Sequence, residues 1–147
     1  MSLTVAVINC GAEKCSSSKK AKDLYTGSLF VASRQYVESN YDSYIILSAK
    51  YHMCLPNDIL QPYELYLGHL SKADKKVWNE ITAQEMAQTF PVGTVFDFYT
   101  SKMYQEGLIP ILRSLGYTCN TNLNNLGMGY KIQWFQQHTK RNTKKLF

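Results

Sequence analysis

The chain has 147 residues, of which 45% are hydrophobic and 18% are charged. This length allows one domain with one core and is too short for two ordinary domains. Lysine and arginine outnumber aspartate and glutamate by 16 to 11, which gives a net charge of +5 at pH 7 and excludes an acidic, disordered chain. Such a charge favours a polyanion as the partner.

No apolar run reaches the roughly 20 residues that a bilayer requires, and no signal peptide opens the chain. We therefore expect a cytoplasmic protein that does not contact a membrane. The spacings of the four cysteines are unrelated and contain no Cys-x-x-Cys pair, so we expect reduced thiols. Neither the cysteines nor the histidines have ligand spacing, and we predict no metal site and no cofactor.

The first part of the chain predicts two buried strands around one helix. Residues 4–10 are β-branched and apolar, which is typical of a parallel strand buried on both faces. A polar loop over residues 11–22 follows. From Thr26 or Gly27 to Asn40, apolar residues recur at helical spacing. Residues 44–49 predict the second buried strand.

The second part of the chain continues this alternation after a long loop. Residues 50–69 contain two prolines and no sustained period, and a structured loop of this length is usually functional. A helix is expected over residues 71–90, with Ser71 as its N-cap and Asp74 at the capping-box position. A strand over 92–99, a helix over 104–115, a strand over 117–121 and a helix over 131–138 follow.

This order of elements predicts one α/β domain over residues 1–139, followed by a basic tail over residues 140–147 that we expect to be flexible. The domain is expected to be a three-layer sandwich, in which a mainly parallel sheet of about four strands carries helices on both faces. Ligands of such sheets bind at the carboxyl ends of the strands. The loops that follow the four strands therefore form one candidate rim.

The first rim loop contains Cys10 and Gly11, followed by serines and lysines. Small hydroxyl residues, backbone amides and lysines after a strand can hold a phosphate or a sugar hydroxyl, although no P-loop motif is present. The alternative is a solvated loop in which Cys10 is a small buried residue. The turn formed by Gly127 and Gly129 can likewise bring a helix N-terminus close to an anion.

The second rim loop, LSAKYHMCLPNDILQPYELYL over residues 47–67, is the most unusual segment. A carboxylate beside tyrosines and a lysine can act as a nucleophile or general base while its neighbours orient a leaving group. We therefore predict Glu64, Tyr63 and Lys50 as catalytic residues. The alternative is that the tyrosines of this loop are packing residues. The predicted substrate-binding residues are Cys10, Ser48, Tyr51, Tyr25, Tyr104, Gly127 and Gly129.

Five motifs in order resemble a family of small phage and bacterial domains of unknown function: INC, AKDLYTGSLFVASRQYVE, YIILSAKYHMCLPNDILQPYELYL, DFYTSKMYQEGLIPILRSLGY and LGMGYKIQWF. The resemblance covers residues 4–137. His52 departs from the family pattern, because relatives usually have glycine after the loop tyrosine. The Cys-Ser-Lys motif of the first loop is also interrupted here.

Residues 47–68 also resemble a loop of the YaaA peroxide-stress proteins, which bind DNA, and more faintly the core of archaeosine-forming tRNA enzymes. The resemblance implies a connection to nucleic acid or a nucleobase and does not fix a reaction. The leading hypothesis is a protein that processes a nucleobase, a nucleotide or nucleic acid, with the N-glycosidic bond as a candidate reaction site. Glu64 would be the nucleophile or general base. The alternatives are a non-catalytic DNA-binding or phage–host interaction module, and a degenerate relative with a structural or inhibitory role.

The positive charge is concentrated at the end of the chain. Lys140, Arg141, Lys144 and Lys145 supply four of the five net charges, and residues 1–139 contain 12 basic and 11 acidic residues. We therefore predict these four side chains as the nucleic-acid contacts.

Overall fold

The buried strands form one five-stranded sheet with the order β4-β3-β1-β6-β7. The computed structural model describes residues 3–140. Four strands run parallel to one another: β1 (Thr4–Asn9), β3 (Tyr44–Ser48), β6 (Val95–Phe98) and β7 (Thr118–Thr121). The fifth, β4 (His52–Cys54), is antiparallel to β3 and lies at the edge.

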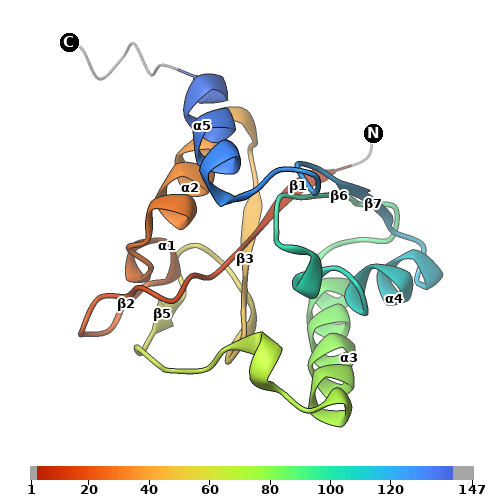
Figure 1. Ribbon diagram of the computed structural model, residues 1–147. Helices are drawn as coiled ribbons and strands as arrows, with labels where there is room; N and C mark the ends of the chain where they lie inside the picture. Colours follow the sequence, from red (N-terminus) through yellow and green to blue (C-terminus); the bar gives the residue numbers. More distant parts are fainter. Residues whose placement is uncertain (1–2, 141–147) are drawn as a thin grey trace.

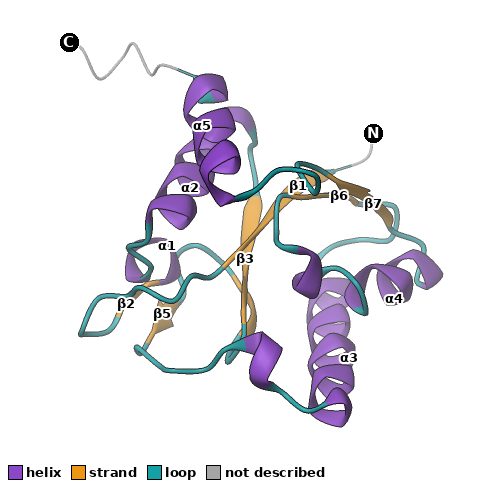
Figure 2. Cartoon of the chain, in the orientation of Figure 1, coloured by secondary structure: helices purple, strands orange, loops and turns teal. Residues whose placement is uncertain are grey.

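Helices cover both faces of this sheet (Figure 1). One layer consists of α1 (Ala21–Leu24), α2 (Ser28–Asn40) and α5 (Met128–His138), and the other of α3 (Lys72–Thr89) and α4 (Leu108–Ser114). Figure 2 shows the strands lying between these two groups of helices. The α/β fold with a mainly parallel sheet is therefore confirmed. Among residues 3–140, no helix is both long and apolar enough to cross a membrane.

The central strand β1 is buried on both faces, as its apolar sequence predicts. Val5 and Val7 pack in the core beneath α3 and α4, whereas Ala6 and Ile8 pack in the core beneath α2. This division follows from the alternation of side chains along a strand. All four of these side chains are fully buried, which explains why the strand contains no polar residue between Val5 and Ile8.

The segment over residues 50–69 contains more regular structure than a loop. It includes β4, the short strand β5 (Ile59–Leu60) and the 3-10 turn η1 (Leu67–His69). Strand β5 pairs with β2 (Lys19–Lys20), so it joins the second rim loop to the polar first loop. His52 begins β4 with a φ of 64°, a left-handed conformation that glycine adopts most easily. The turn thus keeps a glycine-like backbone although its residue is histidine.

Two helix predictions had different outcomes. The helix expected over residues 71–90 is confirmed as α3, and the Asp74 amide donates a hydrogen bond to the Ser71 side chain at 3.1 Å. The helix expected over residues 104–115 begins later, at Leu108, after a separate 3-10 turn η2 (Lys102–Tyr104). The chain passes so close to α3 at Gly107 that a Cβ there would overlap the Asn79 side chain.

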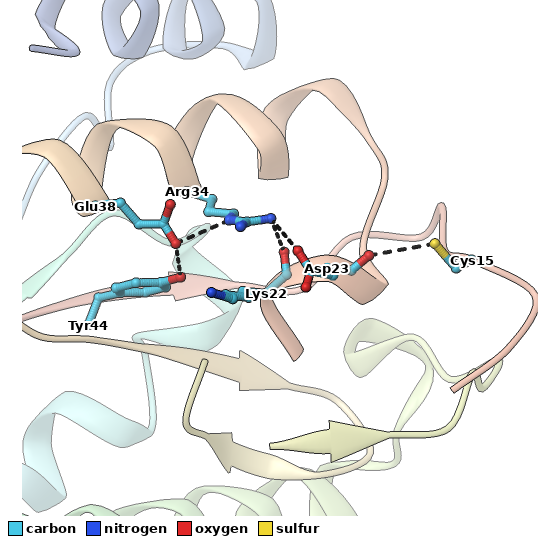
Figure 3. Close-up of polar contacts among 6 residues, drawn as sticks. All are labelled: Cys15, Lys22, Asp23, Arg34, Glu38 and Tyr44. Carbon is cyan, nitrogen blue, oxygen red and sulfur yellow. Dashed lines mark hydrogen bonds and ion pairs between the residues drawn. The ribbon is translucent and has the colours of Figure 1, made fainter. Parts of the chain in front are cut away.

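A cluster of charged and polar side chains joins α1, at the end of the first rim loop, to α2 (Figure 3). The Arg34 guanidinium of α2 donates to the Lys22 carbonyl at 2.7 Å and to the Asp23 carboxylate at 2.9 Å, both on α1. It also donates to Glu38 at 3.2 Å, and Glu38 accepts a hydrogen bond from Tyr44 at 2.6 Å. These bonds hold α1, and with it the end of the loop after β1, against α2.

The strand order creates a switch point at β1. The chain passes from β1 to β3 on one side, and later returns to β6 on the other side of β1. The connection after β1 therefore leads toward β3, whereas the connection after β6 leads the opposite way toward β7, and a crevice forms between the carboxyl ends of β1 and β6. The loops after β1 and β6 are brought together at this crevice.

Candidate functional site

A cavity of about 600 Å³ opens at the switch point. The volume suits a small organic ligand. Its wall combines the loop after β1, the segment before α3 and the loop after β6. The lining residues are Asn9, Cys10, Gly11, Ala12, Lys14, Glu64, Leu65, Tyr66, His69, Ser101, Met103 and Tyr104.

Asn9 ties together the two loops that form the floor of this cavity. Its side-chain amide donates to the Cys10 carbonyl at 2.8 Å, and its side-chain carbonyl accepts a hydrogen bond from the Ser101 amide at 3.0 Å. Asn9 is not among the site residues predicted from the sequence. The available signal was a polar residue at the carboxyl end of an otherwise apolar strand.

Cys10 and Tyr104, both predicted as substrate-binding residues, meet at the cavity wall. The Cys10 Sγ lies 3.1 Å from the Tyr104 hydroxyl oxygen. Burial, followed by the neighbouring Cys10, raises the pKa of Tyr104 well above its ordinary value. The phenol therefore stays protonated, and it can donate a hydrogen bond to the sulfur or to a ligand.

Glu64 presents a free carboxylate to the same cavity. It forms no hydrogen bond or ion pair with residues 3–140, and its side chain is exposed. Lys14 lines the cavity as well, and its Nζ donates to the Ala12 carbonyl at 3.0 Å. A carboxylate and an ammonium group thus border one space, together with the His69 imidazole. This set can accept and donate protons and can bind an anionic or hydroxyl-bearing ligand.

Tyr63 does not line the cavity, but its ring contacts the cavity residue Lys14. The Lys14 Nζ is 4.6 Å from the centre of the Tyr63 ring, a cation–π contact. The Tyr63 hydroxyl lies 2.7 Å from the hydroxyl of Tyr25 and 2.7 Å from that of Ser48. Burial is the largest cause of the raised pKa values of both tyrosines, so these phenols are neutral hydrogen-bonding groups.

Ser48 joins this buried network to the turn after β3. Its Oγ accepts hydrogen bonds from the amides of Lys50 at 3.2 Å and Tyr51 at 3.0 Å. Its carbonyl accepts a hydrogen bond from the Trp78 indole at 3.0 Å. Ser48 is fully buried, so its contacts position the second rim loop and do not reach the cavity.

The other predicted site residues lie away from the cavity lining. The Lys50 Nζ lies 5.3 Å from the Tyr51 ring centre, and the Tyr51 hydroxyl donates to the Gln61 carbonyl at 3.3 Å. Gly127 and Gly129 are exposed where α5 begins. Lys140 is exposed, and the predicted nucleic-acid contacts Arg141, Lys144 and Lys145 lie outside the described residues.

Two aromatic residues of the cavity had been given no role in binding. Tyr66 directly precedes η1 and His69 is its last residue, and their rings meet edge to face with centroids 4.8 Å apart. Half of the Tyr66 surface is exposed, so its ring can stack on a planar ligand. The sequence signal was the aromatic density before α3, which equally suits a packed core.

Within residues 3–140, no three side chains of histidine, cysteine, aspartate or glutamate are grouped so that they could hold a metal ion. The comparison with curated proteins gives no match. The resemblance of residues 47–68 to the YaaA proteins stays a prediction. The family of unknown function DUF6884 matches residues 5–137, which is most of the chain. The protein therefore belongs to DUF6884.

Proposed function

We propose that the protein binds a nucleoside or nucleotide in the cavity at the end of β1 and hydrolyses its N-glycosidic bond. The observation that carries this proposal is the free carboxylate of Glu64 in a cavity that also contains an ammonium group, an imidazole and an exposed aromatic ring. The position at the switch point of a parallel sheet supports ligand binding there.

Each group of the cavity matches one part of such a ligand. The Tyr66 ring offers a stacking face for a base, where base–aromatic stacking is worth about 1–3 kcal/mol. Glu64 can accept hydrogen bonds from sugar hydroxyls, and Lys14 supplies positive charge for an oxygen-rich group. The Cys10–Tyr104 pair lines the same cavity.

The reaction uses the carboxylate to stabilise charge that develops on the sugar. As the bond between the anomeric carbon and the base nitrogen breaks, the sugar acquires oxocarbenium character, which a nearby carboxylate stabilises. Water then adds to the anomeric carbon and gives its proton to Glu64, while the departing base nitrogen takes a proton from His69. Transfer of the Glu64 proton to His69 through solvent restores both groups. The products are the free sugar and the free base, and water is the one reactant consumed besides the substrate.

Lys14 takes the place that the sequence suggested for Lys50 in this proposal. Lys14 lines the cavity, whereas Lys50 extends over Tyr51 outside it. Tyr63 acts on the ligand indirectly, because its ring contacts the Lys14 ammonium and its hydroxyl is engaged with Tyr25 and Ser48.

Base release from nucleosides and nucleoside monophosphates, separated by chromatography, tests the proposal. Glu64→Gln keeps the size of the side chain and removes its charge, so we expect the rate to fall by about 10²-fold or more. Glu80→Gln is the matched control, because Glu80 is exposed on α3 and does not line the cavity. Equal rates for wild type and Glu64→Gln would remove Glu64 from the reaction, and no release by wild type would refute the proposed activity.

The charge distribution favours a second candidate, in which the tail binds nucleic acid without catalysis. Residues 140–147 contain four basic and no acidic side chains. Affinity for a DNA duplex should then fall steeply with salt, because each phosphate contact releases counterions. Deletion of residues 140–147 should abolish most of the binding. An unchanged affinity after this deletion would refute the role of the tail.

A further inference from the structure

A second, smaller cavity lies on the other side of the end of β1. Its volume is about 80 Å³. It lies on the face covered by α2 and α5, whereas the larger cavity faces η1 and η2. The two cavities share Asn9, Cys10, Gly11 and Ser101. The remaining residues that line the smaller cavity are Leu29, Phe30, Ser33, Tyr99 and Lys131.

The two cavities adjoin at the four residues that line both, so a ligand in the larger cavity lies next to the smaller one. On the same measure of volume a water molecule needs about 10–15 Å³, so the smaller cavity has room for a compact group such as one tetrahedral oxyanion. The larger cavity has room for a base and a sugar. The sizes therefore suit a ligand with one large organic part and one compact group.

The charge of the smaller cavity is positive and uncompensated. In the described part of the chain, Lys131 is the one charged residue that lines it, and Lys131 forms no ion pair there. Burial, together with the nearby ammonium group of Lys102, lowers the pKa of Lys131. The folded chain thus keeps a partly desolvated cation beside a like charge, and a bound anion would stabilise it.

Hydrogen-bond donors at the shared wall are also free. Among residues 3–140, neither the Gly11 amide nor the Ser101 hydroxyl forms a hydrogen bond. A Cβ at Gly11 would meet nothing within 4 Å, so space is open beside the Gly11 Cα. These donors are complementary to the oxygens of a phosphate group.

The first turns of two helices border the same cavity. Leu29 and Phe30 belong to α2, and Lys131 belongs to α5. Neither helix has an acidic residue in its first turn or a side chain that caps it. Their positive ends therefore reinforce the charge of Lys131 and are not the sole basis for an anion site.

We propose that the smaller cavity binds the phosphate of a nucleoside monophosphate, with Lys131 as the residue that contacts it. This inference rests on the proposed function for the base and sugar, and it narrows the substrate class from nucleosides and nucleotides to nucleoside monophosphates. The compact volume favours one phosphate over a longer chain.

Three ligands and two variants test this inference. Isothermal titration measures binding of inorganic phosphate, uridine and uridine 5′-monophosphate to wild type, Lys131→Met and Lys76→Met. Methionine keeps the length of the side chain without its charge, and Lys76 is an exposed residue of α3 outside both cavities. We expect wild type and Lys76→Met to prefer the monophosphate over uridine by at least about tenfold, the usual scale of a charge-assisted hydrogen bond. Lys131→Met should lose this preference, keep its affinity for uridine, and bind inorganic phosphate at least about tenfold more weakly than wild type.

The outcomes separate this inference from the proposed function. If uridine and its monophosphate bind equally well, or if the two lysine variants behave alike, the phosphate site is refuted while nucleoside binding stands. If inorganic phosphate binds through Lys131 but neither uridine compound binds, the oxyanion site stands and its assignment to a nucleotide is overturned together with the proposed function. Binding of none of the three ligands refutes both.

Discussion

Substitution of Tyr63 tests whether this residue stabilises the structure beneath the cavity without taking part in the reaction. Tyr63→Phe removes one hydroxyl that makes two hydrogen bonds of 2.7 Å, to Tyr25 and to Ser48. Ser48 keeps the two amide hydrogen bonds that it accepts. The Tyr25 hydroxyl loses its hydrogen-bond partner although Tyr25 is only 2% exposed.

The expected cost follows from these contacts. Two hydrogen bonds contribute about 0.5–1.5 kcal/mol each, and a buried hydroxyl without a partner adds about 1–3 kcal/mol. We expect Tyr63→Phe to lower the free energy of unfolding by about 3 kcal/mol and Tm by roughly 6–12 °C. Tyr130→Phe is the control, because Tyr130 is 69% exposed and its hydroxyl bonds to nothing among residues 3–140.

Urea unfolding of the two single variants and the double variant isolates the contact between the tyrosines. Tyr25→Phe should cost about 1 kcal/mol, because Tyr63 keeps its hydrogen bond to Ser48. Tyr25→Phe with Tyr63→Phe should cost about 1–2 kcal/mol less than the sum of the single effects, since no hydroxyl is left without a partner. Additive costs, or a cost below about 0.5 kcal/mol for Tyr63→Phe, would refute this account of the network. A loss of base release by Tyr63→Phe as large as that of Glu64→Gln would refute its supporting role.

The remaining predictions concern pH, thiol reactivity and one turn. Burial raises the pKa of Cys54 from 9.0 to about 12 and that of Cys119 to about 11. These thiols ionise at lower pH in the unfolded chain than in the folded protein, so the free energy of unfolding should fall as pH rises above 9.0. A free energy of unfolding in urea that stays constant across this pH range would contradict this expectation. Alkylation of the native protein, followed by peptide mapping, should label Cys10 before the two buried thiols, and a bound nucleotide should slow that labelling because Cys10 lines both cavities. Gly116→Ala should lower the free energy of unfolding by about 1–2 kcal/mol, because Gly116 has a φ of 96°. Gly129→Ala in α5 has open space around its Cα and should raise the free energy of unfolding by about 0.5–1 kcal/mol. Equal effects of the two substitutions in thermal unfolding would contradict both expectations.

Elements with a local signal were predictable from the chain alone. The strand β1 follows from an apolar run, and α2 from helical spacing of its buried residues. The start of α3 follows from Ser71, because an N-cap bond joins residues three positions apart. In each of these cases, the residues that decide the structure are near neighbours in sequence.

Elements that depend on distant partners were not predictable. Strands β4 and β5 are two or three residues long, and each exists because it pairs with another segment. The helix α4 starts at Leu108 in place of residue 104, where Gly107 meets Asn79 of another helix. Periodicity within one segment contains no information on these contacts.

The candidate site shows the same limit. Residue types and the strand-end rule identified Glu64 and Cys10 as site residues, and both line the cavity. Lys50 had equal support in the sequence, but the turn into β4 carries it to Tyr51 and away from the cavity. The functional groups of single side chains can be predicted from the sequence. Whether these groups lie in one cavity depends on the strand order β3-β1-β6, in which non-consecutive strands become neighbours. That order arises from packing of the whole sheet.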